Sequence, residues 1–392
     1  MSLNHNNQHI HQFFKNKELN ELYISFGVFN FALGLISVFV PIYLYKLNYS
    51  ILEILFFFFI TSVAFVVFSY PGAKIVSKLG VKHTMLTTIP ILIAFFVGLR
   101  FIGEFPILFF ILPFLRAFKM ILYNYSFHLN FIQHSDNKKR GREFSMAQAS
   151  ATMAGILSPF IGGIIIQLTN FSVLFFTGSA FLFIAMIPLF MTKDTYEKIN
   201  FNRKNILLDM FKKENLPLLF SFSGYAIESW IGLILWPIFL FILAISVESI
   251  GAITSIAALL TFLVFYFIGK ATDTKDKKSL LKIGTFLYFF GWVGRIFVGG
   301  ATSALFVDTF KNLFQNFINV PWAICFYDIA AKRNYFKFIV QREIIFNFSR
   351  MIALLVIMII FSLNLPHAFT LTFAIAALSS LFYMAIAKKL PS

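Results

Sequence analysis

Cysteine is almost absent from this 392-residue chain, in which Cys325 is the only one. A single cysteine excludes a disulfide framework and a cysteine-ligated metal site within one chain. The chain also lacks the metal-binding pattern His-Glu-x-x-His, a phosphate-cradling Gly-Lys-Ser/Thr loop and the Gly-x-Ser-x-Gly turn of a nucleophilic serine. Its seven histidines are scattered, mostly in tails and loops. These absences argue against enzyme classes built on such motifs, and we expect no cofactor and no metal.

Charged residues are scarce as well, at 13% of the chain, whereas hydrophobic residues make up 59%. No soluble core of this size needs so much apolar sequence, so the expected solvent is the lipid bilayer. Apolar runs of about 18–25 residues alternate with short polar breaks, and each run can cross a hydrocarbon layer of about 30 Å as a helix. Runs such as 54–60 and 354–361 are apolar on every side, which excludes the alternating pattern of a membrane β-barrel. The prediction is an all-α membrane protein.

The polar breaks predict about twelve transmembrane helices in two groups of six. The predicted spans are 21–45, 51–72, 83–102, 106–132, 144–167, 172–191, 216–243, 249–269, 279–298, 302–328, 343–363 and 368–387. A polar tail (1–20) without a cleavable signal peptide precedes an N-terminal six-helix bundle (21–191). A charged cytoplasmic linker (192–214) then leads to a C-terminal bundle (215–392).

The net charge of +16 is confined to alternate loops. The basic segments are 74–82, 138–142, 193–213, 270–282, 332–342 and the two tails, and the breaks between them hold almost no Lys or Arg. This positive-inside pattern places both termini in the cytoplasm and explains the charge without a nucleic-acid partner. We expect a multi-pass protein of the plasma (inner) membrane. The high Phe, Ile, Lys and Asn content is typical of an AT-rich bacterial genome.

The two halves resemble each other in sequence. The segment Pro41–Tyr45 recurs as Pro237–Phe241, an offset of 196 residues (237 minus 41). Phe118-Lys119 with Asn124 recurs as Phe310-Lys311 with Asn316, an offset of 192 (311 minus 119). Asp136 and Asp328 follow, and then Arg142-Glu143 and Arg342-Glu343 open the next predicted helix of each half. Because each half has six spans, the halves share one orientation and form a parallel repeat.

Two loops and one helix carry a family signature. The loop after the predicted helix 8 contains Gly269, Asp273, Lys277 and Lys278, and the equivalent loop after helix 2 contains Gly80 and Lys82, with Ser77 where an acid is expected. Helix 5 contains Ser158-Pro159-Phe160-Ile161-Gly162-Gly163. This set resembles the major facilitator superfamily over essentially the whole chain. The resemblance implies a gate in which the loop acid pairs with basic groups, and Ser77 leaves that role mainly to Asp273. Topology alone also explains basic loops, and packing alone explains membrane glycines.

Charged residues inside the predicted spans are functional candidates, since each costs about 2.5–3.5 kcal/mol at the bilayer centre on insertion scales. They are Arg116, Lys119, Glu228, Arg295, Asp308, Lys311 and Arg350. The family resemblance implies that helices 1, 4, 7 and 10 line a central cavity, and five of these residues lie on those helices. A polar stripe on helix 10 includes Asn312, Gln315 and Asn319, and Asn30, Asn124 and Tyr225 are further candidates for the cavity.

Glu228 or Asp308 is the predicted site of proton coupling, because a buried carboxylate can load and release a proton as the cavity alternates. Arg116 and Lys119 are then available to an anionic substrate group. The alternative is that either acid forms a structural bridge with Arg116 or Lys119. Arg295 and Arg350 lie nearer a surface and are assigned structural or snorkelling roles.

The sequence thus predicts a monomeric secondary transporter of a small molecule, driven by a proton or another ion through alternating access. The helix 5 element favours export of a drug or metabolite, and the mixed cavity charge favours a polar or zwitterionic solute. Two alternatives stay open: a degenerate facilitator that acts as a membrane receptor or scaffold, and a polytopic membrane enzyme.

Overall fold

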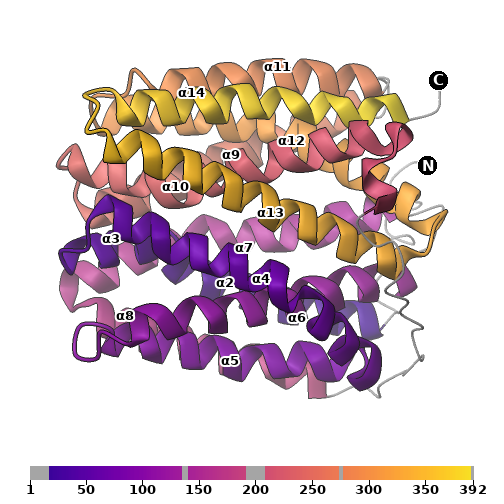
Figure 1. The fold of residues 1–392 in the computed structure, drawn as a ribbon, viewed down its shortest axis with the longest axis horizontal. Coiled ribbons are helices and arrows are strands. Elements are labelled where there is room, and N and C mark those ends of the chain that lie inside the picture. The colour runs from indigo at the N-terminus through magenta and orange to yellow at the C-terminus, as the bar shows by residue number, and fades with distance from the viewer. Residues whose placement is uncertain (1–16, 135–139, 191–207, 273–276, 390–392) are drawn as a thin grey trace, which may run out of the picture.

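The computed structural model describes residues 17–134, 140–190, 208–272 and 277–389, and these form helices without any β-strand. The first half consists of α2 (Lys17–Ser37), α3 (Phe39–Lys46), α4 (Ile51–Leu79), α5 (Val81–Phe101), α6 (Leu108–His134), α7 (Arg140–Leu168) and α8 (Phe171–Phe190). The second half consists of α9 (Leu216–Ile242), α10 (Val247–Thr272), α11 (Lys277–Arg295), α12 (Ala301–Ala331), α13 (Tyr335–Ser362), α14 (Ala368–Ser380) and the 3₁₀ helix η3 (Leu381–Lys389). The long helices run side by side, with the first half in the lower and the second half in the upper part of Figure 1.

The predicted twelve-helix arrangement is confirmed, with α2 and α3 forming the first span and α14 with η3 the last. Several helices extend further than the hydrophobic runs, and α4 continues to Leu79 instead of residue 72. The prediction that the eleventh helix starts at Glu343 is wrong. This helix, α13, starts at Tyr335 because the side chain of Asn334 accepts a hydrogen bond from the backbone N–H of Lys337 and caps it. Arg342 and Glu343 are therefore inside the helix and buried, not in a loop.

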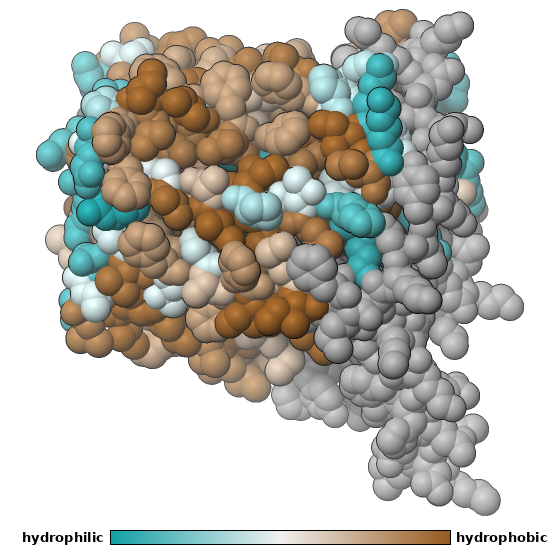
Figure 2. All heavy atoms as spheres, turned by 90° about the horizontal axis from the view of Figure 1, so that it is seen from below, coloured by the Kyte–Doolittle hydropathy of each residue, from teal (hydrophilic) through white to brown (hydrophobic). Residues whose placement is uncertain are grey.

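Seven helices of the described residues are long and apolar enough to cross a membrane. They are Ile24–Lys46, Ile51–Leu79, Val81–Phe101, Leu108–Gln133, Lys213–Ile242, Tyr335–Ser362 and Ala368–Lys388. Three shorter apolar stretches, Thr152–Leu168, Phe171–Ile187 and Val247–Leu263, supplement them. Hydrophobic side chains cover the middle of the face in Figure 2, and hydrophilic ones gather at its left end. An apolar belt with polar ends is what a bilayer requires.

The internal repeat is visible in the backbone and in a contact between the halves. Asn48 and Ala244 end the first helix of each half and both have positive φ angles, 65° and 59°, at positions 196 residues apart (244 minus 48). The rings of Tyr45 and Phe241, separated by the same offset (241 minus 45), lie 6.1 Å apart and join the two halves. Equivalent residues that meet in this way indicate a pseudo-twofold axis between the halves.

The halves also pack through α7 against α10 and through α4 against α13. At the first contact a Cβ added to Gly163 would lie 2.9 Å from the Cα of Glu248, and one added to Gly251 would lie 2.4 Å from the carbonyl oxygen of Pro159. Only glycine permits backbones to approach this closely. Gly162 packs against Leu35 of α2 within the first half, so the two neighbouring glycines serve different interfaces.

The described end of the linker attaches to the second half. It forms two short 3₁₀ helices, η1 (Leu208–Phe211) and η2 (Lys213–Asn215). Asp209 forms a 2.7 Å ion pair with Lys337 at the start of α13, and Arg333 donates a 2.9 Å hydrogen bond to Asn215. These contacts connect the linker to the turn between α12 and α13.

Candidate functional site

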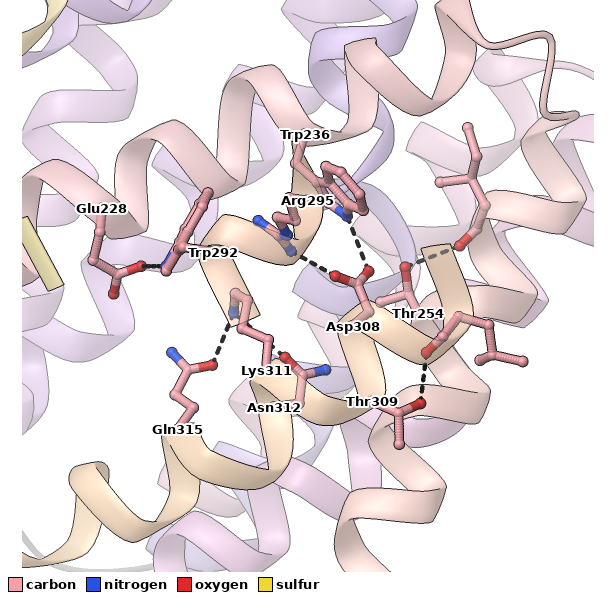
Figure 3. A network of polar contacts seen from close by, with 12 residues as sticks. Glu228, Trp236, Thr254, Trp292, Arg295, Asp308, Thr309, Lys311, Asn312 and Gln315 are labelled. Carbon is pink, nitrogen blue, oxygen red and sulfur yellow. Dashed lines mark hydrogen bonds and ion pairs between the residues drawn. The ribbon is translucent and has the colours of Figure 1, made fainter. Parts of the chain in front are cut away.

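The described residues contain a buried ion pair between α11 and α12. The guanidinium of Arg295 donates to the Asp308 carboxylate at 2.7 Å, and the Trp236 indole donates to its other oxygen at 2.9 Å (Figure 3). Arg295 lies between the rings of Trp236 and Trp292, at 4.1 and 4.4 Å from their centroids. Of the two roles expected for Arg295, this pairing agrees with the structural one and not with snorkelling, since the residue is 4% exposed and paired inside the protein. Asp308 does form a bridge, as the structural alternative proposed, but its partner is Arg295 and not Arg116 or Lys119.

Glu228 is held differently, by neutral hydrogen-bond donors. Its carboxylate accepts hydrogen bonds from Tyr383 at 2.6 Å, Tyr288 at 2.9 Å and Trp292 at 3.1 Å. The residue is 1% exposed, and within the described part of the chain no Lys or Arg forms an ion pair with it. Three donors compensate for much of the lost hydration, but among the described residues no cation forms an ion pair with the carboxylate.

Lys311 connects Glu228 to the polar stripe on α12. Its ammonium lies 5.0 Å from the ring centroid of Tyr288, one of the Glu228 donors. It donates to Gln315 at 3.3 Å and approaches the side-chain oxygen of Asn312 at 3.5 Å (Figure 3). The predicted stripe of Asp308, Asn312 and Gln315 is thus part of one network that reaches Glu228 through the aromatic rings of α11.

The predicted intramembrane cations of the first half, Arg116 and Lys119, have aromatic neighbours but no ion pair among the described residues. The guanidinium carbon of Arg116 lies 4.9 Å from the ring centroid of Phe58 and 5.7 Å from that of Trp230. The ammonium of Lys119 lies 4.7 Å from the ring centroid of Tyr123. From the second half, Arg350 lies 4.2 Å from the same Trp230 ring and is 7% exposed, so the assignment of Arg350 to a surface is wrong. Trp230 brings Arg116 and Arg350 together across the two halves.

A second polar cluster joins the halves nearer the linker. Asn124 of α6 donates to Glu343 of α13 at 2.8 Å, and Glu343 is ion-paired with its neighbour Arg342. Arg342 also donates to Nε2 of His128, so the proton of this imidazole is on Nδ1, which lies 2.7 Å from the hydroxyl oxygen of Tyr327. We call these five residues the cross-half cluster.

A cavity of about 300 Å³ lies beside the cross-half cluster. Its polar lining is Asn124, His128, Asn319, Arg342, Glu343 and Arg350, and its aromatic lining is Tyr225, Trp322, Phe326, Tyr327 and Phe346. A smaller cavity of about 150 Å³ adjoins the Asp308–Arg295 pair and includes Trp236 and Asn312. The larger cavity has the size and the mixed apolar and polar lining of a small-molecule site.

Some predicted residues lie apart from these networks. The amide of Asn30 donates to the backbone carbonyl of Phe26 in its own helix. Gly80 ends α4 with a positive φ of 81°, which favours glycine, and Lys82 lies in the first turn of α5. Ser77 donates to the carbonyl of Lys74.

The second-half loop signature is only partly described. Asp273 lies outside the described residues, Gly269 lies near the end of α10, and Lys277 and Lys278 begin α11. The predicted gate at this loop therefore stays a prediction.

Sequence reasoning identified only Asn124 of the cross-half cluster and missed the aromatic donors. Arg342 and Glu343 were excluded as loop residues because the hydrophobic run begins after them. The signal that identifies them is the Asn334 cap, which starts the helix two turns earlier. Nothing in the sequence distinguishes Tyr288, Trp292 and Tyr383 from other aromatic residues of the apolar spans. Their role as hydrogen-bond donors depends on the Glu228 carboxylate that they surround in the folded protein.

Comparisons with known proteins agree with this architecture. The sequence profile described as Major Facilitator Superfamily matches residues 22–335. The structural match to a mutant of the nucleoside transporter NupG covers 95% of this chain and 100% of the NupG chain, at 13% sequence identity and a TM-score of 0.68. The match to a second NupG structure covers 95% of this chain and 99% of the NupG chain, at 14% sequence identity and a TM-score of 0.65. Among curated proteins, none matches the chain.

Proposed function

Because the chain belongs to the major facilitator superfamily, we propose that it transports a small polar solute by alternating access and couples this movement to a proton on Glu228. Membership of this family makes the chain a multi-pass membrane transporter and not an enzyme. The cavity between the halves is the proposed solute site. Its aromatic and polar lining suits a polar solute with a planar part, and NupG, which shares the fold, is named a nucleoside transporter.

The environment of Glu228 is the observation that supports proton coupling. Its carboxylate is buried and forms no ion pair among the described residues, so binding a proton removes a buried charge that only neutral donors contact directly. The donors come from α11 and η3, so a movement of α9 relative to these elements changes their hydrogen bonds and with them the preference for the proton. Asp308 is the weaker candidate, because its carboxylate is already ion-paired with Arg295.

We test this with purified protein in liposomes that contain a pH-sensitive dye. Addition of a solute panel of nucleosides, amino acids and organic anions should produce solute-dependent proton movement through the wild type. Glu228→Gln should abolish proton movement while solute exchange between the two sides continues, because exchange needs no net proton transfer. Glu104→Gln, which changes an exposed acid at a helix end, is the matched control.

Proton movement that is equal in the wild type and Glu228→Gln would refute coupling at this residue. An absence of solute movement for every member of the panel would instead favour the receptor or scaffold alternative. We further propose a plasma-membrane location, cytoplasmic termini and outward transport. Comparing vesicles of opposite orientation tests the transport direction. In inside-out vesicles with an acidic interior, an exporter moves protons out and accumulates solute inside.

A further inference from the structure

The described spans hold more buried positive than negative charge. The buried cations are Lys119, Arg295, Lys311, Arg342 and Arg350, and the buried acids are Glu228, Asp308 and Glu343. Two of the cations are neutralised by ion pairs, Arg295 with Asp308 and Arg342 with Glu343. Arg116 adds a further half-buried cation without an ion pair among the described residues. Buried charges are normally paired, so this excess needs a negative partner.

Three of the eight buried side-chain polar atoms that lack a hydrogen-bond partner among the described residues belong to Trp230 and the two arginines beside its ring. Nε1 of Trp230, Nε of Arg116 and Nε of Arg350 are all buried and have no hydrogen-bond partner among the described residues. All three groups are hydrogen-bond donors. Because none of these three donors has a protein acceptor among the described residues, they are complementary to an anion or another strong acceptor.

Aromatic stacking does not remove this need. A ring face attracts the plane of a guanidinium, but the N–H groups point outward within that plane and stay available. Among the described residues, Arg350 donates one hydrogen bond, from Nη1 to the side-chain oxygen of Asn347 at 3.3 Å. Arg350 also lines the 300 Å³ cavity, whose wall carries Tyr225, Trp322 and Phe346. The cation and the aromatic surface are therefore presented to the same space.

We propose that the transported solute is an organic anion with a planar ring. Its carboxylate or phosphate group binds between Arg116 of the first half and Arg350 of the second half, and its ring lies against the aromatic wall of the cavity. Without the anion the two guanidinium groups repel each other across the interface between the halves. With the anion they attract a common partner, so the solute itself favours the closed arrangement of the halves. This inference rests on the proposed transport function and specifies its substrate.

The test is a thermal-unfolding assay of detergent-purified protein, with a thiol-reactive dye that reports exposure of the buried Cys325. The probes are ring-matched pairs of a neutral and an anionic molecule: uracil and orotate, adenosine and AMP, benzamide and benzoate. We expect at least one anion, and neither its neutral partner nor inorganic phosphate alone, to raise the melting temperature of the wild type. Arg116→Gln and Arg350→Gln should each weaken the apparent affinity about 10- to 100-fold. Arg100→Gln removes one exposed cation and serves as the control that keeps the wild-type response.

A second measurement separates ligand binding from a structural role. Loss of an uncompensated buried charge should leave the melting temperature of the ligand-free Arg350→Gln protein unchanged or raise it. The proposal is overturned if neutral and anionic partners protect equally, if no anion in the panel protects, or if the arginine variants keep the wild-type response. Because binding is measured without a proton gradient, these outcomes are independent of whether Glu228 couples transport to protons.

Discussion

At the residue scale, the Asp308–Arg295 pair illustrates why buried charges need each other. Removing one partner of such a pair typically costs about 3–5 kcal/mol, because the other charge is left buried and unpaired. We therefore expect Asp308→Asn and Arg295→Gln each to lower the stability of the protein strongly. The double variant should be more stable than the sum of the single effects predicts, as measured by thermal unfolding with the Cys325 assay. Additive losses would show that the two side chains do not stabilise each other.

The charged residues themselves could be identified from the sequence, but their partners could not. A Lys, Arg, Asp or Glu within an apolar span is conspicuous. Five of the seven predicted charged residues are buried within the second half. Which acid meets which base depends on the rotation and height of neighbouring helices. The sequence suggested Arg116 or Lys119 for Asp308, whereas Arg295 is presented by α11, the helix that immediately precedes α12.

At the element scale, the close contact between α7 and α10 gives a prediction for Gly163. An added methyl group would lie 2.9 Å from a backbone atom of Glu248, which cannot rotate away as a side chain can. Gly163→Ala should force the helices apart at this end, destabilise the protein by about 1–3 kcal/mol and slow transport. Gly155→Ala in the same helix is the control, because its added methyl group would meet nothing within 4 Å. Equal transport by the two variants would contradict a need for this close approach.

The contact between η1 and α13 predicts a dependence on pH outside the membrane. Hydrogen bonds from Lys337 and then Lys212 lower the pKa of Asp209 below the usual value of 3.8. A lowered pKa in the folded state means that the attachment contributes stability above about pH 3.8 and loses it as the pH falls through the pKa of the folded protein. Hydrogen exchange of residues 208–215 should therefore increase in acid once exchange is corrected for its intrinsic pH dependence. Asp209→Asn should show the increased exchange already at neutral pH.

Helix existence could be predicted from the sequence far better than helix ends. The apolar runs identify all twelve spans, because a bilayer demands about 20 apolar residues from each. They do not mark where a helix stops outside the hydrocarbon layer, since polar residues continue a helix as well as apolar ones. At α13 this difference of eight residues decided whether Arg342 and Glu343 belonged to a loop or to the protein interior.

At the scale of the whole molecule, the two halves have kept one fold and diverged in charge. The offset that relates Lys119 to Lys311 also relates Arg116 to Asp308. In the second half this position carries an acid that neutralises Arg295, whereas in the first half it carries a cation without an acidic partner among the described residues. Two ion pairs thus neutralise part of the charge buried in the second half, whereas Arg116 of the first half stays without an ion pair among the described residues. This divergence leaves Arg116 available to an anion bound between the halves.

The cross-half cluster should determine how firmly the halves close near the linker. The hydrogen bond from Asn124 to Glu343 and that from Arg342 to His128 both cross the interface, and they share the Arg342–Glu343 ion pair. Glu343→Gln removes this ion pair and leaves Arg342 without its acid, so the closed arrangement loses stability relative to an open one.

Distances between spin labels measure this loss. In a Cys325→Ser background the labels are placed through His83→Cys in the first half and Lys332→Cys in the second, both exposed positions. We expect Glu343→Gln to add a population with longer distances between the labels, whereas Glu104→Gln, which lies in the loop between α5 and α6, should keep the original distribution. An identical distribution in both variants would mean that the halves are held together by apolar packing of α4 against α13 and that the cluster serves the cavity alone.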